Sequence, residues 1–146
     1  MERRWQVLTV VSVAVFMVSL DLFIVNIAFP DIERSFHHSS LATVSWVLNA
    51  YAIVLAALLV SAGRLADRVG RRRIFLVGLL IFLAGSALCG LAPSIATLVV
   101  ARVVQAAGAA CLMPTSLALL LAEFAPAQRP AAIGVWATVG GVAAAA

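Results

Sequence analysis

The sequence predicts an all-α integral membrane protein with four transmembrane helices and the start of a fifth. The first reason is composition: 64% of the 146 residues are hydrophobic and only 11% are charged, whereas soluble domains carry about 25% charged residues. The second reason is that the apolar residues gather into runs of about 20, the length that a helix needs to cross a bilayer. This composition excludes a soluble enzyme. The net charge of +4 and the pI of about 10.5 would by themselves suggest nucleic-acid binding. The small share of charged residues in so apolar a chain indicates a membrane protein instead.

Each expected span is an apolar run bounded by polar or proline-containing segments. The spans are 7–29, 44–62, 74–92, 95–121 and the incomplete 131–146. Pro30 is expected to end the first span. The fifth run is only about 24 Å long at 1.5 Å per residue, whereas a bilayer core is about 30 Å thick. We therefore expect residues 1–146 to form the N-terminal transmembrane bundle segment of a longer protein.

The arginines predict the orientation of these spans. Eight of the ten basic residues precede the first span or follow the second and fourth spans, and all ten are arginine. Because cytoplasmic loops carry an excess of basic residues, the N-terminus and these loops are expected in the cytoplasm. The abundance of alanine and arginine without lysine favours a bacterial source. We thus expect a multi-pass protein of the cytoplasmic membrane, with the lipid bilayer as a partner.

Small residues and short connections predict how the helices pack. Short loops favour antiparallel packing of successive helices. Small side chains let helix backbones approach closely in a membrane. Such residues recur in the third, fourth and fifth spans: Gly78, Gly85 and Gly90; Ala106, Gly108 and Ala110; and Ala137, Gly141 and Ala145.

Two charged residues lie inside the spans. Asp21 lies nine residues before Pro30, and Arg102 lies nine residues after Pro93. Nine residues place each charge about 13 Å below the same membrane boundary, so the two share one depth. One interpretation is a static ion pair that fixes helix packing, and the other is a protonatable carboxylate that couples protons to transport. Because charges inside a membrane are costly, we favour the functional interpretation.

Two amides accompany these charges. Gln105 lies one helical turn after Arg102, so it can hydrogen-bond to the charged pair, to a substrate or to a neighbouring helix. Asn26 follows Asp21 by five residues, which rotates it by about 140° on the helix. We therefore expect Asn26 to serve another interface or to line a cavity elsewhere.

The densest polar stretch, GRLADRVGRRR at residues 63–73, lies between the second and third spans. Gly63 is expected to allow a close approach to another backbone, and Gly70 a turn with positive φ. Asp67 can accept charge-assisted hydrogen bonds from a helix N-terminus or from a guanidinium. The general excess of basic residues in cytoplasmic loops explains the arginines of this stretch. It does not explain the aspartate and the two glycines.

No other residues in the sequence indicate a reaction centre. Cys89 and Cys111 are expected to differ in depth by about 20 Å, too far apart for a disulfide. His37 and His38 have no further ligand spaced around them, so we expect no metal site. Without a nucleotide-binding loop, a metal cluster or a nucleophile–histidine pair, the sequence predicts neither an enzyme nor a cofactor.

Three segments resemble motifs of a known family. The stretch at residues 63–73 resembles the G-x-L-A-D-R-x-G-R-R loop motif of the major facilitator superfamily. LDLFIVNIAFP at residues 20–30 resembles the first-helix motif of its drug:proton antiporter branch with fourteen spans. RVVQAAGAA at residues 102–110 resembles the R-x-x-Q-G motif of the fourth helix, with Ala106 in place of glycine. Trp46, Asn49 and Tyr51 also resemble that branch.

The resemblance implies a transporter of two six-helix bundles with alternating access. It implies that Asp67, Arg68 and Arg71 form a cytoplasmic latch with the remaining C-terminal helices. It also implies that Arg102 takes part in proton coupling and Asp21 in transport. The predicted function is therefore proton-coupled efflux of drugs or small organic molecules, with that substrate and protons as partners. The alternatives are a solute importer of the same superfamily, a non-transporting membrane scaffold subunit, and a complete four-helix exporter that dimerises.

Overall fold

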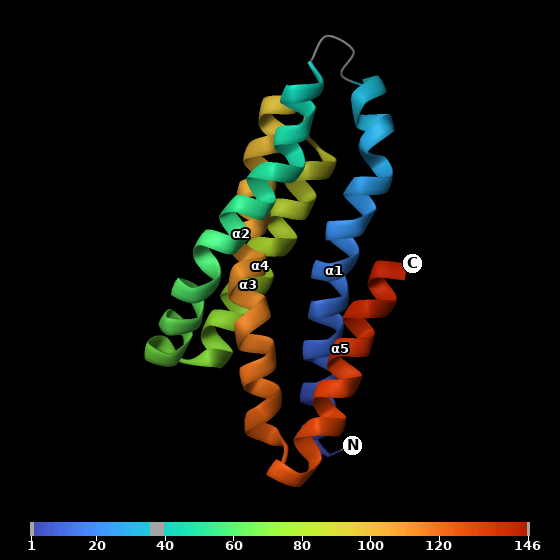
Figure 1. Cartoon of the computed structure of the whole chain (residues 1–146). Helices are drawn as coiled ribbons and strands as arrows, with labels where there is room; N and C mark the ends of the chain where they lie inside the picture. The colour runs from blue at the N-terminus through green and yellow to red at the C-terminus, as the bar shows by residue number, and fades with distance from the viewer. Residues whose placement is uncertain (1, 36–39, 146) are drawn as a thin grey trace.

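The computed structural model describes residues 2–35 and 40–145, and every regular element in these ranges is helical. The elements are α1 (Arg3–Ser35), α2 (Leu41–Val69), α3 (Arg71–Gly90), α4 (Ile95–Glu123), the short 3₁₀ helix η1 (Pro126–Gln128) and α5 (Arg129–Ala145). Helices α1 to α4 are long and apolar enough to cross a membrane. The predicted fold class is thus confirmed (Figure 1). His37 and His38 lie outside the described residues.

Helix α1 is longer than the span expected from the sequence. We expected Pro30 to end it, but the helix continues through Pro30 to Ser35, so that expectation was wrong. Proline lacks the amide proton for one helical hydrogen bond, yet its fixed φ is compatible with a helix. Beyond it, the Ser35 hydroxyl donates to the Asp31 carbonyl oxygen at 2.8 Å, and Arg34 pairs with the Asp31 carboxylate at 3.5 Å. These local contacts stabilise the last turns of the helix.

The segment expected to be a polar loop is mostly helical. Helix α2 continues to Val69 and α3 begins at Arg71, so Gly70 alone joins them. Gly70 has the positive φ expected of it, 117°, which residues with a Cβ rarely adopt. The close backbone approach expected at Gly63 is not seen. Its nearest neighbour is Pro114 of α4, and an added Cβ would lie at an ordinary contact distance of 3.6 Å.

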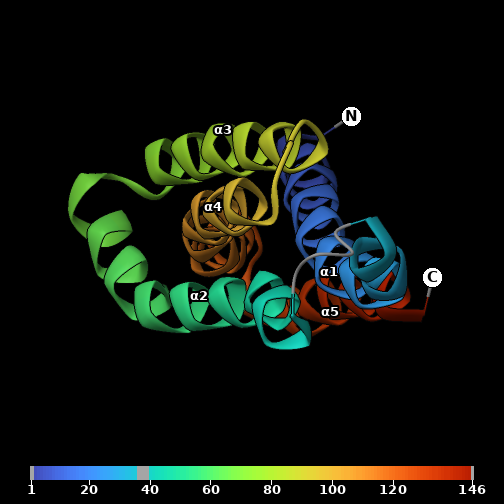
Figure 2. The ribbon, with the colours of Figure 1, turned by 90° about the horizontal axis from the view of Figure 1, so that it is seen from above.

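Helix α4 lies at the centre of the bundle. Figure 2 shows α3 on one side of α4, α2 on the opposite side, and α1 on a third. Helix α5 packs mainly against α1 rather than against α4. The expectation that successive helices are close neighbours is therefore fulfilled by α3 and α4, whereas α1 and α2 meet only briefly. The bundle consists of an α2–α3–α4 group and an α1–α5 pair, which meet mainly where α1 contacts α4.

Helices α3 and α4 meet along a seam of glycines, which we define as Gly78, Gly85 and Gly108. A Cβ at Gly78 would lie 2.6 Å from the Cys111 Cβ, and one at Gly85 would lie 2.7 Å from the Cα of Gln105. A Cβ at Gly108 would overlap the backbone of α3 at Phe82. The predicted close packing is thus found along this seam. It is not found at Gly90, which has no atom within 4 Å of an added Cβ.

The small residues of α5 pack differently from the expectation. Ala137 and Gly141 are exposed, so the stripe expected on this helix does not pack against the bundle. Instead Gly140 faces α1, where an added Cβ would lie 3.3 Å from a Val15 methyl group and 3.4 Å from the Ser19 hydroxyl oxygen. Helix α5 also contacts α4, because the Trp136 indole N–H donates to the Ser116 hydroxyl at 3.3 Å.

The helices alternate in direction, so the connections gather at two ends. The N-terminus, the Gly70 joint and the turn between α4 and α5 lie toward the same end of the bundle in Figure 1. Eight arginines belong to these three segments.

Candidate functional site

The two charged residues inside the spans form an ion pair across α1 and α4. Arg102 Nη1 donates to Asp21 Oδ2 at 2.6 Å, although the residues are 81 positions apart in the sequence. The Arg102 side chain is 2% exposed and that of Asp21 is 15% exposed. Arg102 is this deeply buried because α4 lies at the centre of the bundle. The equal depths derived from Pro30 and Pro93 thus correspond to a direct contact.

Gln105 joins this pair into a closed network. Its side-chain amide Nε2 donates to Asp21 Oδ1 at 2.8 Å, while its Oε1 accepts from Arg102 Nη1 at 2.8 Å. Both carboxylate oxygens of Asp21 therefore accept hydrogen bonds from α4. We call Asp21, Arg102 and Gln105 the polar cluster. A network in a low-dielectric interior is strong when its members are satisfied and costly when one is removed.

Two contacts of the polar cluster were not anticipated from the sequence. The guanidinium carbon of Arg102 lies 4.0 Å from the ring centroid of Tyr51 on α2, which is a close cation–π contact. The Cys89 thiol on α3 donates to Gln105 Oε1 at 3.5 Å. One signal was available for Tyr51, which is the single tyrosine of the chain and lies within an apolar run. A buried tyrosine usually has a polar or cationic neighbour.

Asn26 does not join the polar cluster. Its side-chain Nδ2 donates to the Leu22 carbonyl oxygen of its own helix at 2.8 Å, and the residue is exposed. This agrees with the rotation expected from its spacing to Asp21.

The residues expected to form the cytoplasmic latch lie around the Gly70 joint. The Arg71 side chain pairs with Asp67 across this joint, with Nε and Nη2 each 3.1 Å from Asp67 Oδ1. The pair is open to solvent, since the Asp67 side chain is 64% exposed and that of Arg71 is 47% exposed. Arg68, in the last turn of α2, is also exposed. An exposed ion pair contributes little to stability, so these side chains are available for another partner.

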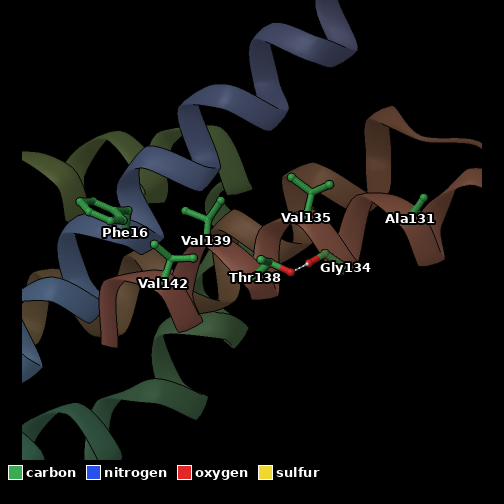
Figure 3. A pocket seen from close by; sticks show the side chains of 7 residues that line it. All are labelled: Phe16, Ala131, Gly134, Val135, Thr138, Val139 and Val142. Atoms are coloured by element: carbon green, nitrogen blue, oxygen red, sulfur yellow. Dashed lines mark hydrogen bonds between the residues drawn. The ribbon is translucent and has the colours of Figure 1, made fainter. Parts of the chain in front are cut away.

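A groove whose lining contains no ionisable residue runs between α1 and α5 (Figure 3). It has a volume of about 620 Å³. Its walls are almost entirely apolar and are formed by Phe16, Ala131, Gly134, Val135, Thr138, Val139 and Val142. The hydroxyl of Thr138 donates to the Gly134 carbonyl oxygen of its own helix at 2.7 Å. This groove therefore presents hydrophobic surface rather than the chemistry of the polar cluster.

The chain is similar to bacterial proteins that are named for drug resistance, export or transport. It is 45% identical over 143 residues to the multidrug resistance protein Stp of Mycobacterium tuberculosis, covering 96% of this chain and 26% of that protein. It is 45% identical over 144 residues to the tetracenomycin C resistance and export protein of Streptomyces glaucescens, covering 99% and 27%. It is 37% identical over 142 residues to the riboflavin transporter RibZ of Clostridioides difficile, covering 97% and 31%. The chain thus spans less than a third of the length of these relatives.

The sequence profile described as Major Facilitator Superfamily matches residues 11–146. The match begins in the third turn of α1 and includes the polar cluster, the Gly70 joint and all of α5. Because it covers far more than half of the sequence and agrees with the helical fold, the chain belongs to the Major Facilitator Superfamily.

Proposed function

We propose that this chain supplies the N-terminal helices of a transporter that exports drugs or other small organic molecules in exchange for protons. Two of the relatives are named for resistance, and one of these also for export, which supports efflux. In this proposal the helices lie in a bacterial cytoplasmic membrane, with the arginine-rich end in the cytoplasm. The remaining C-terminal helices complete the transport pathway, as in the fourteen-span antiporter branch.

The observation that carries proton coupling is the contact of Asp21 with Arg102 and Gln105. A carboxylate that accepts hydrogen bonds through both oxygens is bound tightly to α4. Proton uptake by Asp21 removes its negative charge and therefore the ion pair. The contact between α1 and α4 then differs in strength between the two protonation states. A transporter needs such a two-state element to couple protons to alternating access.

The exposed residues around the Gly70 joint supply the second part of the proposal. Asp67, Arg68 and Arg71 act as a latch that contacts the C-terminal bundle in one state of the transport cycle. The partial exposure of the Asp67–Arg71 pair supports this role, because both side chains have unoccupied surface for a partner. Rocking of one bundle against the other then makes and breaks the latch.

Proton-driven drug efflux in membrane vesicles tests the proposed function. Inverted vesicles containing the complete transporter should accumulate a fluorescent drug when their interior is acidified, and a protonophore should abolish the accumulation. Asp21→Asn should remove gradient-driven accumulation because it keeps the shape of the side chain without its charge. Asp31→Asn is the matched control, since Asp31 lies on the same helix but is exposed. Proton coupling through Asp21 is wrong if Asp21→Asn retains gradient-driven accumulation.

The competing function is solute uptake. The similarity to a protein named as a riboflavin transporter supports it, because that name states no direction of transport. Right-side-out vesicles distinguish the two functions. Net accumulation of riboflavin driven by an inward proton gradient supports uptake, whereas net release of a preloaded drug supports efflux. A scaffold subunit shows neither.

A further inference from the structure

We propose that Tyr51 is a positioning residue whose ring holds the Arg102 guanidinium in place when Asp21 is uncharged. The contact itself is independent of any activity. Its use during proton uptake by Asp21 rests on the proposed function. Tyr51 would thus complete the proton-coupling device from α2, a helix that contributes no member to the polar cluster.

The first support for this proposal is the incomplete hydrogen bonding of the Arg102 guanidinium. Arg102 donates two hydrogen bonds, both from Nη1, to Asp21 and to Gln105. Its Nε is buried and has no hydrogen-bond partner among the described residues. The Tyr51 ring faces the guanidinium at 4.0 Å, and Tyr51 and Arg102 are only 1% and 2% exposed. A cation held against an aromatic face in a desolvated site is stabilised by the negative face of the ring.

The second support is the set of groups that remain when Asp21 becomes neutral. From α3, the Cys89 thiol donates to Gln105, so it offers Arg102 no anion. On α5, the ionisable residue is Arg129, whose side chain donates to the Phe124 carbonyl oxygen far from the polar cluster. Gln105 Oε1 and the Tyr51 ring are then the partners left for the cation among the described contacts. Without the ring, Arg102 would be a buried charge with one acceptor, which is strongly unfavourable.

The third support concerns the Tyr51 hydroxyl. Its oxygen is buried and has no hydrogen-bond partner in the part of the chain that the structure describes. The hydroxyl therefore does not fix the position of the side chain, and the ring is the part of Tyr51 that contacts Arg102. This separates two variants. Tyr51→Phe keeps the aromatic face and removes a polar group that has no partner, whereas Tyr51→Leu removes the aromatic face.

The pH dependence of efflux by the complete transporter tests the role in proton coupling. If the ring stabilises Arg102 beside neutral Asp21, then losing it disfavours the protonated state. Tyr51→Leu should therefore move the pH of half-maximal efflux toward acid by about one unit, the size expected of a desolvated cation–π contact. Tyr51→Phe should keep the pH profile of the parent. A parental profile for Tyr51→Leu, or an equal shift for Tyr51→Phe, overturns the proposal.

A thermal unfolding cycle tests the contact without any transport. Asp21→Asn imitates the uncharged carboxyl, so Tyr51→Leu should lower the Tm of purified transporter more in the Asp21→Asn background than in the parent. Equal losses in the two backgrounds overturn the proposal. If Tyr51→Leu does not fold, Tyr51→Met takes its place. An absence of proton-driven efflux in the parent refutes the proposed function, while this cycle still decides the role of Tyr51.

Discussion

The glycine seam makes a sharp prediction about how α3 and α4 support the polar cluster. Gly85→Ala adds one methyl group where three atoms of Gln105, its N, Cα and Cβ, would each lie 2.7 Å from the new Cβ. To reach an ordinary contact of 3.4 Å, the helices must separate locally by about 0.7 Å. Two of these atoms are backbone, so the clash cannot be relieved by rotating a side chain.

The expected effect of Gly85→Ala is a net loss of stability. Overpacking of a well-packed interior costs about 1–3 kcal/mol, and replacing a helical glycine by alanine gains about 1 kcal/mol of helix propensity. Because three atoms clash at once, we expect the clash to prevail and the free energy of unfolding to fall by up to about 2 kcal/mol. The displacement also shifts Gln105, whose hydrogen bond to Asp21 measures 2.8 Å.

Thermal unfolding of the purified complete transporter in detergent measures this effect. The matched control is Gly90→Ala on the same helix, where an added Cβ has no atom within 4 Å. We expect a lower Tm for Gly85→Ala and an unchanged or slightly higher Tm for Gly90→Ala. Equal Tm values for the two variants would show that the α3–α4 contact is looser than the structure indicates, and the reasoning from the glycine seam would be refuted.

Two further predictions concern the joint between α2 and α3. Gly70→Ala forces a residue with a Cβ to adopt a φ of 117°, so we expect a loss of about 1–2 kcal/mol by thermal unfolding, while Gly141→Ala, in open space, serves as the control. A Tm of Gly70→Ala equal to or higher than that of Gly141→Ala would contradict this expectation. Asp67→Asn and Arg71→Ala should leave the Tm nearly unchanged, because the pair is exposed, yet slow efflux through the latch. Efflux at the rate of an Arg73→Ala control would count against the latch.

The fold class and the central ion pair follow from the sequence for simple physical reasons. A helix must be about 20 apolar residues long to cross a bilayer, so the composition and its runs are sufficient to predict spanning helices. Asp21 and Arg102 are costly inside a membrane, and equal distances from Pro30 and Pro93 place them at one depth. Their contact in the structure requires one further fact, the adjacency of α1 and α4, which depth alone does not provide.

The helix ends and the neighbours of the polar cluster were not predictable in the same way. Whether Pro30 ends α1 depends on the local contacts of Asp31 with Arg34 and Ser35, which oppose the cost of one missing hydrogen bond. The approach of Tyr51 to Arg102 depends on how α2 crosses α4. Short connections bring successive helices near each other, but the glycine seam and the central place of α4 determine which faces meet.

The division of the bundle into an α2–α3–α4 group and an α1–α5 pair has a mechanical consequence. The glycine seam interlocks α3 and α4, whereas the contact of Asp21 with Arg102 and Gln105 bridges α4 to α1. The close-packed glycine seam thus lies within one group, and the buried ion pair lies between the two groups. Any change in charge at Asp21 therefore acts on the boundary between the α1–α5 pair and the α2–α3–α4 group rather than inside either of them.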